Sequence, residues 1–170
     1  MENQPMPRRS FLNALTSGAF FALPAFMLTP AARAAKAYEV TRTDAQWKAL
    51  LTPEQFTVLR KAGTERPFSS PLDKEKREGV FACAGCQLPL FSSATKFNSG
   101  TGWPSFFKPL PDAVEKESDT TLGMRRDEVL CRRCGGHLGH VFDDGPKPTG
   151  LRYCMNGLSL AFTPGGAPAV

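Results

Sequence analysis

From Gly79 onward, the hydrophobic positions of this chain fall into short groups separated by glycine, proline, asparagine or aspartate. Short apolar groups bounded by turn-forming residues predict short strands. Their spacing favours a small antiparallel β domain over alternating βαβ units, which need a helix between consecutive strands. The groups are Val80-Phe81, Leu88-Leu90-Phe91, Val129-Leu130, Val141-Phe142 and Leu158-Leu160-Phe162.

Two capping patterns precede the β region and predict two short helices. Thr43 and Asp44 can cap a turn or two, and the Thr-Pro-Glu-Gln run at 52–55 has an N-cap, a proline at N1 and a glutamine that closes a capping box. Gly63 predicts the end of the second helix. A surface loop is expected over 64–76, where nothing indicates chemistry. The apolar residues that these helices carry are Trp47, Leu50, Leu51, Phe56 and Leu59.

The first 37 residues have the pattern of an export signal. Arg8 and Arg9 precede an uncharged run over 10–32, and Ala-x-Ala sequences follow. The run Pro-Arg-Arg-Ser-Phe-Leu at 7–12 resembles the twin-arginine motif, whose pathway exports folded proteins. A retained membrane anchor is the alternative, although polar residues, glycine and proline make the run weakly hydrophobic. We expect cleavage after Ala34 or Ala37, which leaves residues 38–170 as an exported, soluble domain, periplasmic where there are two membranes.

The net charge of +5 gives little information about partners once this segment is set aside. Residues 38–170 hold 17 basic and 15 acidic residues, a net +2, because four of the basic residues and only one acidic residue lie in the leader. The basic balance is therefore no argument for a nucleic-acid partner. The full 170 residues suffice for one domain with a hydrophobic core.

Four of the five cysteines form two Cys-x-x-Cys pairs, Cys83 with Cys86 and Cys131 with Cys134. Four thiolates are the tetrahedral ligand set that Zn²⁺ takes in closed structural sites. One zinc ion per chain would then join two distant segments and stabilise the fold without binding substrate. Two disulfides are the alternative, which export makes reasonable.

The fifth cysteine, Cys154, lies close in sequence to both histidines of the chain, His137 and His140, and to Arg152. A thiolate nucleophile needs a base or a cation nearby. An unpaired cysteine can also be a small buried apolar residue. The coincidence of every histidine with the only unpaired cysteine favours a reactive thiol.

A tightly turned loop, Ser-Gly-Thr-Gly-Trp-Pro-Ser-Phe at 99–106, holds Trp103 between a glycine and a proline. Its indole could belong to the core, or it could form an apolar wall beside the reactive thiol.

The chain resembles the B-type peptide-methionine (R)-S-oxide reductases over about residues 44–162. The motifs that carry the resemblance are Gly-Trp-Pro-Ser-Phe (102–106), His-Leu-Gly-His-Val-Phe (137–142), Asp-Gly-Pro (144–146) and Gly-Leu-Arg-Tyr-Cys-Met-Asn (150–156), interleaved with the two Cys-x-x-Cys pairs. The resemblance implies a mainly β fold of two antiparallel sheets with short N-terminal helices and a structural zinc. It also implies reduction of methionine-R-sulfoxide, free or within proteins.

By this resemblance, Cys154 is the nucleophile and Trp103 receives the methyl group of the substrate. The polar surround is His137, His140, Asp144, Arg152 and Asn156. Arg152 and the histidines would favour the thiolate, and a protonated histidine, His140 by preference, would donate a proton to the sulfoxide oxygen. Cys154 would become a sulfenic acid, which a thioredoxin-like or other thiol reductant restores.

The sequence departs from many relatives at Thr101, where those relatives place a second, resolving cysteine. Threonine cannot attack a sulfenic acid, so we expect a cycle that uses Cys154 alone and an external thiol.

Three other functions compete with this one. A zinc-ribbon module could bind phosphate through Arg125, Arg126, Arg132 and Arg133, although it leaves Cys154 and the histidines unexplained. A Cys-His hydrolase would use the same dyad, but no glycine-rich oxyanion turn adjoins Cys154. A structural disulfide protein is the third alternative.

Overall fold

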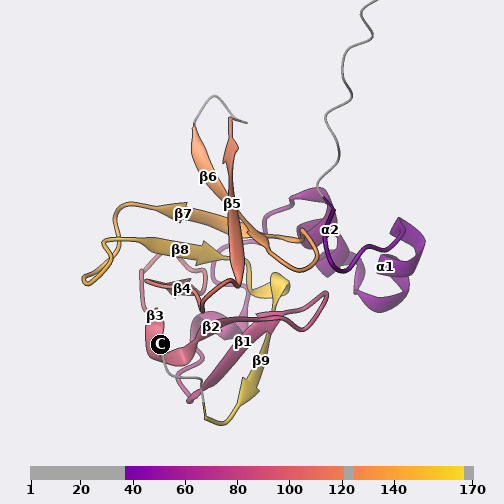
Figure 1. Cartoon of the computed structure of the whole chain (residues 1–170). Helices are drawn as coiled ribbons and strands as arrows, with labels where there is room; N and C mark the ends of the chain where they lie inside the picture. The colour runs from indigo at the N-terminus through magenta and orange to yellow at the C-terminus, as the bar shows by residue number, and fades with distance from the viewer. Residues whose placement is uncertain (1–36, 121–124, 167–170) are drawn as a thin grey trace, which may run out of the picture. The chain divides into compact units, whose positions relative to one another are not determined.

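Two antiparallel sheets form the framework of the computed structural model, which describes residues 37–120 and 125–166 (Figure 1). The predicted mainly β architecture with short N-terminal helices is therefore confirmed. The smaller sheet has the strand order β2-β1-β9, from Pro89–Ser92, Gly79–Cys83 and Leu160–Pro164. The larger sheet has the order β3-β4-β8-β7-β6-β5, from Lys96–Phe97, Ser105–Phe106, Arg152–Met155, His137–Phe142, Arg126–Cys131 and Val114–Asp119.

The leader predicted for residues 1–37 lies outside the described residues except for Ala37, so the export signal and its cleavage positions stay predictions. Among the residues that are described, none of the helices has the length and apolar character needed to span a membrane.

Both short helices begin where the capping patterns predict. Helix α1 (Asp44–Leu50) is capped by Thr43 and α2 (Pro53–Lys61) by Thr52, and each start has a complete capping box closed by a glutamine three residues on. The left-handed residue that ends α2 is Ala62, at φ 51°, and the N–H of Gly63 then binds the carbonyl of Thr57 at 3.0 Å.

Aromatic packing joins the two sheets. Phe91 of β2 stacks on Phe106 of β4 with ring centroids 4.3 Å apart, and Phe81 of β1 meets the same ring edge-on at 5.0 Å. All three rings are fully buried. Offset and edge-on pairs of this kind add about 0.5–1.5 kcal/mol each beyond the burial of apolar area. This buried aromatic packing therefore holds the sheet that carries the candidate site against the smaller sheet.

Two details of the strand pattern differ from the expectation. Leu158 lies in a 3-10 turn, η4 (Gly157–Ser159), so the last strand begins only at Leu160. Strands β3, β4, β5 and β8 were not predicted, and β5 forms with β6 a hairpin that projects from the body of the domain (Figure 1). The remaining 3-10 turns are η1 (Pro71–Asp73), within the expected loop, and η2 (Ser93–Thr95).

Candidate active site

Cys154 lies at the centre of the larger sheet. It pairs with Ser105 of β4 on one side and with His140 of β7 on the other, and all three strands are antiparallel. Residues directly opposite in an antiparallel pair share one face, with their Cβ atoms about 4.5–5.5 Å apart. The sheet register therefore places the thiol and one imidazole side by side, although 13 intervening residues separate them in the chain.

A cavity of about 140 Å³ opens over this face. Four of the residues predicted for the site line it: Cys154, His140, Trp103 and Asn156. Four further lining residues are Thr64, Arg126, Gly139 and Phe142. Sequence reasoning gave Arg126 only a possible phosphate-binding role and assigned no function to Thr64 or Phe142.

The environment of the Cys154 thiol favours its protonated form. Burial is the main cause and raises the pKa of Cys154, while a hydrogen bond with Thr101 and the nearby Arg152 guanidinium act to lower it. The Arg152 effect has the expected sign. It opposes the larger effect of burial, which sets the direction of the shift.

His140 is held from the outermost strand of the larger sheet. Its Nε2 atom lies 2.9 Å from Oδ2 of Asp119 on β5, and the same oxygen accepts a 2.7 Å hydrogen bond from Arg126. Burial lowers the pKa of His140, Asp119 acts to raise it, and Arg126 and His137 act to lower it further.

The second histidine does not line the cavity. His137 is buried, and its Nδ1 lies 2.6 Å from Oε1 of Glu128 on β6. Its Nε2 is buried without a hydrogen-bond partner among the described residues. The two imidazole rings meet edge-on with centroids 5.4 Å apart. His137 thus lies beside His140, where it bears on the electrostatics of the site.

Glu65 supports the cavity from the loop after α2, a segment in which the sequence indicated no chemistry. Its carbonyl accepts a 3.2 Å hydrogen bond from the Trp103 indole, and its N–H donates to Oδ1 of Asn156 at 3.0 Å. Its buried carboxylate accepts the N–H groups of Gly157 and Leu158 at 2.6 and 2.9 Å. One residue therefore fixes both Trp103 and Asn156.

Arg152 and Asp144 form an ion pair beside the cavity, and neither residue lines it. Two hydrogen bonds of 2.8 Å join the guanidinium to the carboxylate. The pairing lowers the pKa of Asp144 and raises that of Arg152. The guanidinium also stacks on Phe142 at 4.4 Å, so Arg152 is fixed in position close to Cys154.

The four cysteines of the Cys-x-x-Cys pairs converge as predicted. Their sulfur atoms lie within 4.8 Å of one another and all four thiols are free, so they could hold one metal ion. The sulfurs of Cys83 and Cys134 are 3.8 Å apart, and those of Cys86 and Cys131 are 3.5 Å apart. A regular tetrahedron with zinc–sulfur bonds of about 2.3 Å separates its sulfurs by about 3.8 Å, so the donor set fits zinc.

The two cysteine turns share one backbone design. Gln87 and Gly135 each follow the second cysteine of a pair, and both have a left-handed φ, 60° and 66°. Each donates its N–H to the carbonyl of the first cysteine, at 2.9 and 2.8 Å. One turn follows β1 of the smaller sheet and the other follows β6 of the larger sheet. A metal ion held between them would join the two sheets.

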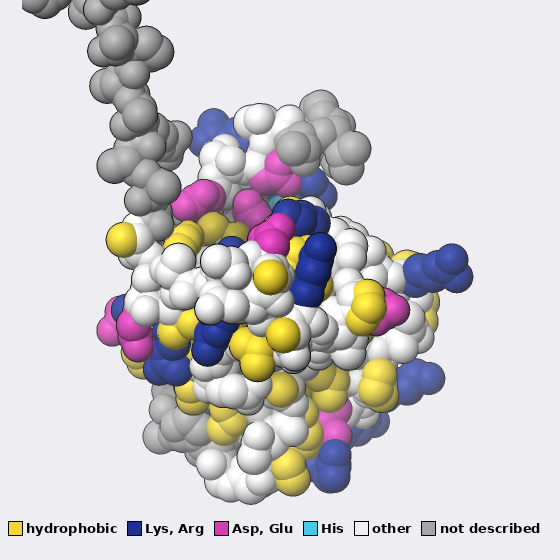
Figure 2. All heavy atoms as spheres, turned by 90° about the vertical axis from the view of Figure 1, so that its right-hand side faces the viewer, with side chains coloured by type: hydrophobic (Ala, Val, Ile, Leu, Met, Phe, Trp, Pro, Cys, Tyr) yellow, Lys and Arg dark blue, Asp and Glu magenta, His cyan; other side chains and the backbone are white. Residues whose placement is uncertain are grey.

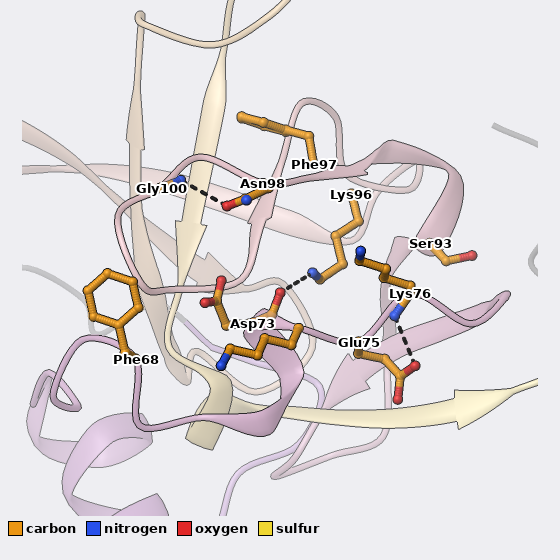
Figure 3. A pocket seen from close by; sticks show the side chains of 10 residues that line it. Phe68, Asp73, Glu75, Lys76, Ser93, Lys96, Phe97, Asn98 and Gly100 are labelled. Carbon is orange, nitrogen blue, oxygen red and sulfur yellow. Dashed lines mark hydrogen bonds between the residues drawn. The ribbon is translucent and has the colours of Figure 1, made fainter.

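A larger cavity, of about 710 Å³, is lined in part by Asn98 and Gly100 of the loop that precedes Trp103 (Figure 3). Lysines and acidic residues from the 73–76 segment line it together with Lys96, whose Nζ donates to the carbonyl of Asp73 at 2.7 Å. Neither cysteine nor histidine is among its described lining residues. Of these two cavities, only the smaller one carries thiol and imidazole chemistry.

The arginines offered as a phosphate-binding patch are largely engaged within the chain. Arg126 binds Asp119, Arg132 donates to the carbonyl of Asp112, and Arg133 pairs with Glu39 at 3.6 Å. Figure 2 shows basic and acidic side chains interspersed over one face of the molecule. These contacts do not favour a phosphate-binding module.

A free thiol beside an imidazole in one cavity, apart from four cysteines that could hold a metal ion, is the arrangement expected of a thiol-dependent enzyme. The SelR domain model matches residues 51–164. The peptide methionine sulfoxide reductase MsrB of Leptospira interrogans is 56% identical over 126 residues, which cover 74% of this chain and 96% of that protein. MsrB of Agrobacterium fabrum is 55% identical over 127 residues (74% and 94%), and that of Thiobacillus denitrificans is 57% identical over 124 residues (72% and 94%). This chain belongs to the MsrB family of oxidoreductases.

Proposed function

We propose that this chain reduces methionine-R-sulfoxide, free or within proteins, to methionine through a sulfenic acid on Cys154. The pairing of Cys154 with His140 in one small cavity, which Trp103 also lines, is the observation that carries the proposal. Family membership supports the reaction class, and the position of the thiol supports the covalent step.

The proposed chemical step begins from the protonated thiol. His140 accepts the Cys154 proton as the sulfur attacks the sulfoxide sulfur, and then delivers that proton to the sulfoxide oxygen. The hydroxyl then passes from the substrate sulfur to the Cys154 sulfur, and the substrate sulfur–oxygen bond and the transient sulfur–sulfur bond both break, so methionine leaves and Cys154 remains as a sulfenic acid. The sulfoxide is reduced by two electrons, and the Cys154 sulfur is oxidised by two.

The other predicted residues take supporting roles in this proposal. Trp103 forms the apolar wall for the substrate methyl group. Asn156, whose amide binds the Glu65 N–H and the Leu138 carbonyl, contributes a fixed polar wall. Arg152, held by Asp144, favours negative charge on Cys154 as the proton leaves. His137 bears on His140 through the edge-on contact of their rings.

Recycling requires two electrons from outside the chain. We propose that a thioredoxin-like or other thiol attacks the sulfenic acid, because the four other cysteines are clustered where they could hold a metal ion. The metal is proposed to be zinc, with one ion per chain. A zinc ion bound by four thiolates has no open position for substrate, so it would stabilise the fold and take no part in the reaction. Residues 1–37 are proposed as a twin-arginine-type signal that delivers residues 38–170 to the periplasm or the exterior, without stable membrane association.

Replacement of Cys154 by serine tests the covalent step. The variant is expected to lose methionine-R-sulfoxide reductase turnover with dithiothreitol and to keep its circular dichroism spectrum and its metal content. Substantial turnover by the variant would refute the role of Cys154.

A further inference from the structure

The carboxylate of Asp119 joins His140 to Arg126. Its Oδ2 atom lies 2.9 Å from Nε2 of His140 and accepts the Arg126 hydrogen bond at 2.7 Å. The side chains of Asp119, His140 and Arg126 are 12%, 14% and 23% exposed, respectively, so water screens their interactions only in part. Asp119 is the last residue of β5 and Arg126 the first of β6, and the two are opposite each other in the hairpin register.

This contact determines which nitrogen of His140 is left for the reaction. An ionised carboxylate accepts hydrogen bonds and cannot donate them, so Nε2 carries the proton in its contact with Asp119. The other ring nitrogen, Nδ1, then has a lone pair when the imidazole is neutral and becomes a donor when it is protonated. A nitrogen of this kind can take a proton and return it.

We propose that Asp119, clamped by Arg126, is the positioning residue for His140, holding Nε2–H so that Nδ1 carries the proton from Cys154 to the sulfoxide oxygen. The inference rests on the proposed function and adds to it two residues of the β5–β6 hairpin. The proton balance closes within the site, since the proton that leaves the thiol reaches the oxygen of the sulfenic acid.

Charged and titratable groups face His140 from each strand packed against it. They are Asp119 on β5, Arg126 and Glu128 on β6, His137 on β7 itself, and Arg152 and Cys154 on β8. Glu128 is directly opposite His140 in register, but its carboxylate binds His137. Asp119 is thus the carboxylate that holds His140 itself.

Replacing Asp119 by asparagine tests the proposal, because it removes the charge and keeps the shape. Burial, Arg126 and His137 all act to lower the pKa of His140, and the Asp119 charge that opposes them would be gone. The imidazolium limb of the kcat profile, which is its acidic side where His140 becomes protonated, should therefore move to lower pH. The turnover number kcat should fall at least tenfold, which is part of the factor of about 10²–10⁴ that acid–base catalysis supplies. The KM for methionine-R-sulfoxide should change less than kcat, because Asp119 acts on proton transfer.

Glu117→Gln is the matched control, since it removes one charge on the same strand two residues away, at an exposed position. It should leave both kcat and the pH profile unchanged. If Asp119 only stabilised the hairpin, Asp119→Asn would lower the melting temperature and leave the pH limb in place. That result would overturn the proposal.

A second measurement tests the geometry without turnover. The chain has two histidines, so nitrogen NMR of the imidazoles gives a simple spectrum that a His140→Asn variant assigns. The neutral His140 is expected as the Nε2–H tautomer in the wild type. The Nδ1–H tautomer would refute the inference even if the reductase activity were confirmed. An Nε2–H tautomer in a protein without reductase activity would support the geometry while the proposed function failed.

Discussion

The hydroxyl oxygen of Thr101 lies 3.9 Å from the sulfur of Cys154. The loop residue that contacts the Cys154 sulfur therefore has no thiol with which to attack an oxidised Cys154. Thr101 is itself held by Ser99, whose hydroxyl oxygen is 2.8 Å away and which also contacts Ser105 at 2.7 Å.

The Cys154 sulfenic acid should consequently persist until an external thiol arrives. Enzyme given one equivalent of methionine-R-sulfoxide without reductant should form a dimedone adduct on Cys154, as measured by mass spectrometry. Thr101→Cys should instead give an internal disulfide to Cys154, and Thr101→Ser should behave as the wild type. A wild-type disulfide from Cys154 to any of Cys83, Cys86, Cys131 or Cys134 at a catalytic rate would contradict this cycle.

The pH dependence of Cys154 alkylation tests the state of the thiol. Because burial raises its pKa, half-maximal alkylation by iodoacetamide should occur above the ordinary thiol pKa of about 8.5. Arg152 acts to lower this pKa, so Arg152→Met should move the midpoint to still higher pH and reduce the thiolate fraction at any fixed pH. Lys108→Met removes a charge from an exposed position and should leave the midpoint in place. A wild-type midpoint below pH 7 would show a preformed thiolate instead.

The four-cysteine site should contain about one zinc ion per purified chain. Cys134→Ser should lose the metal and much of the stability, because a structural zinc contributes folding free energy directly. Cys154→Ser should retain both, which makes it the matched control. Elemental analysis and thermal melting measure the two effects. A protein without metal, in which all four cysteines are oxidised, would refute the site.

Glu65 should stabilise the walls of the cavity from the loop after α2. In Glu65→Gln one of the two N–H groups of Gly157 and Leu158 would face an amide NH₂ in place of an oxygen. The free energy of unfolding should fall by about 1–3 kcal/mol, the cost of an unsatisfied buried donor. Urea denaturation measures the change, with Glu78→Gln, at an exposed position, as control. Equal stability of the two variants would show that Glu65 contributes little.

The sequence predicted the elements that are defined by local patterns. Thr52 and Gln55 close a capping box within four residues, and the two cysteine turns repeat a fixed spacing. Family motifs in turn placed Cys154, His140, Trp103 and Asn156 in one site, and these four do line one cavity.

Strand β5 was missed because it needs no apolar face. Glu115, Lys116, Glu117 and Asp119 fill most of it, and as the edge strand of the larger sheet it is mainly exposed. Asp119, the partner of His140, therefore lies on a strand that hydrophobic periodicity could not predict. Glu65 was missed for a related reason: the burial of a carboxylate in a loop is decided by the N–H groups that reach it from Gly157 and Leu158, about 90 residues away.

The activity toward the two epimers of methionine sulfoxide tests the central claim most directly. Purified residues 38–170 with dithiothreitol should reduce methionine-R-sulfoxide, free or in a peptide, and should leave the S epimer unchanged, with Cys154→Ser inactive on both. Product analysis on a chiral column after separate incubation with each epimer gives the answer. Equal reduction of both epimers, or reduction of the S epimer alone, would contradict the proposed function.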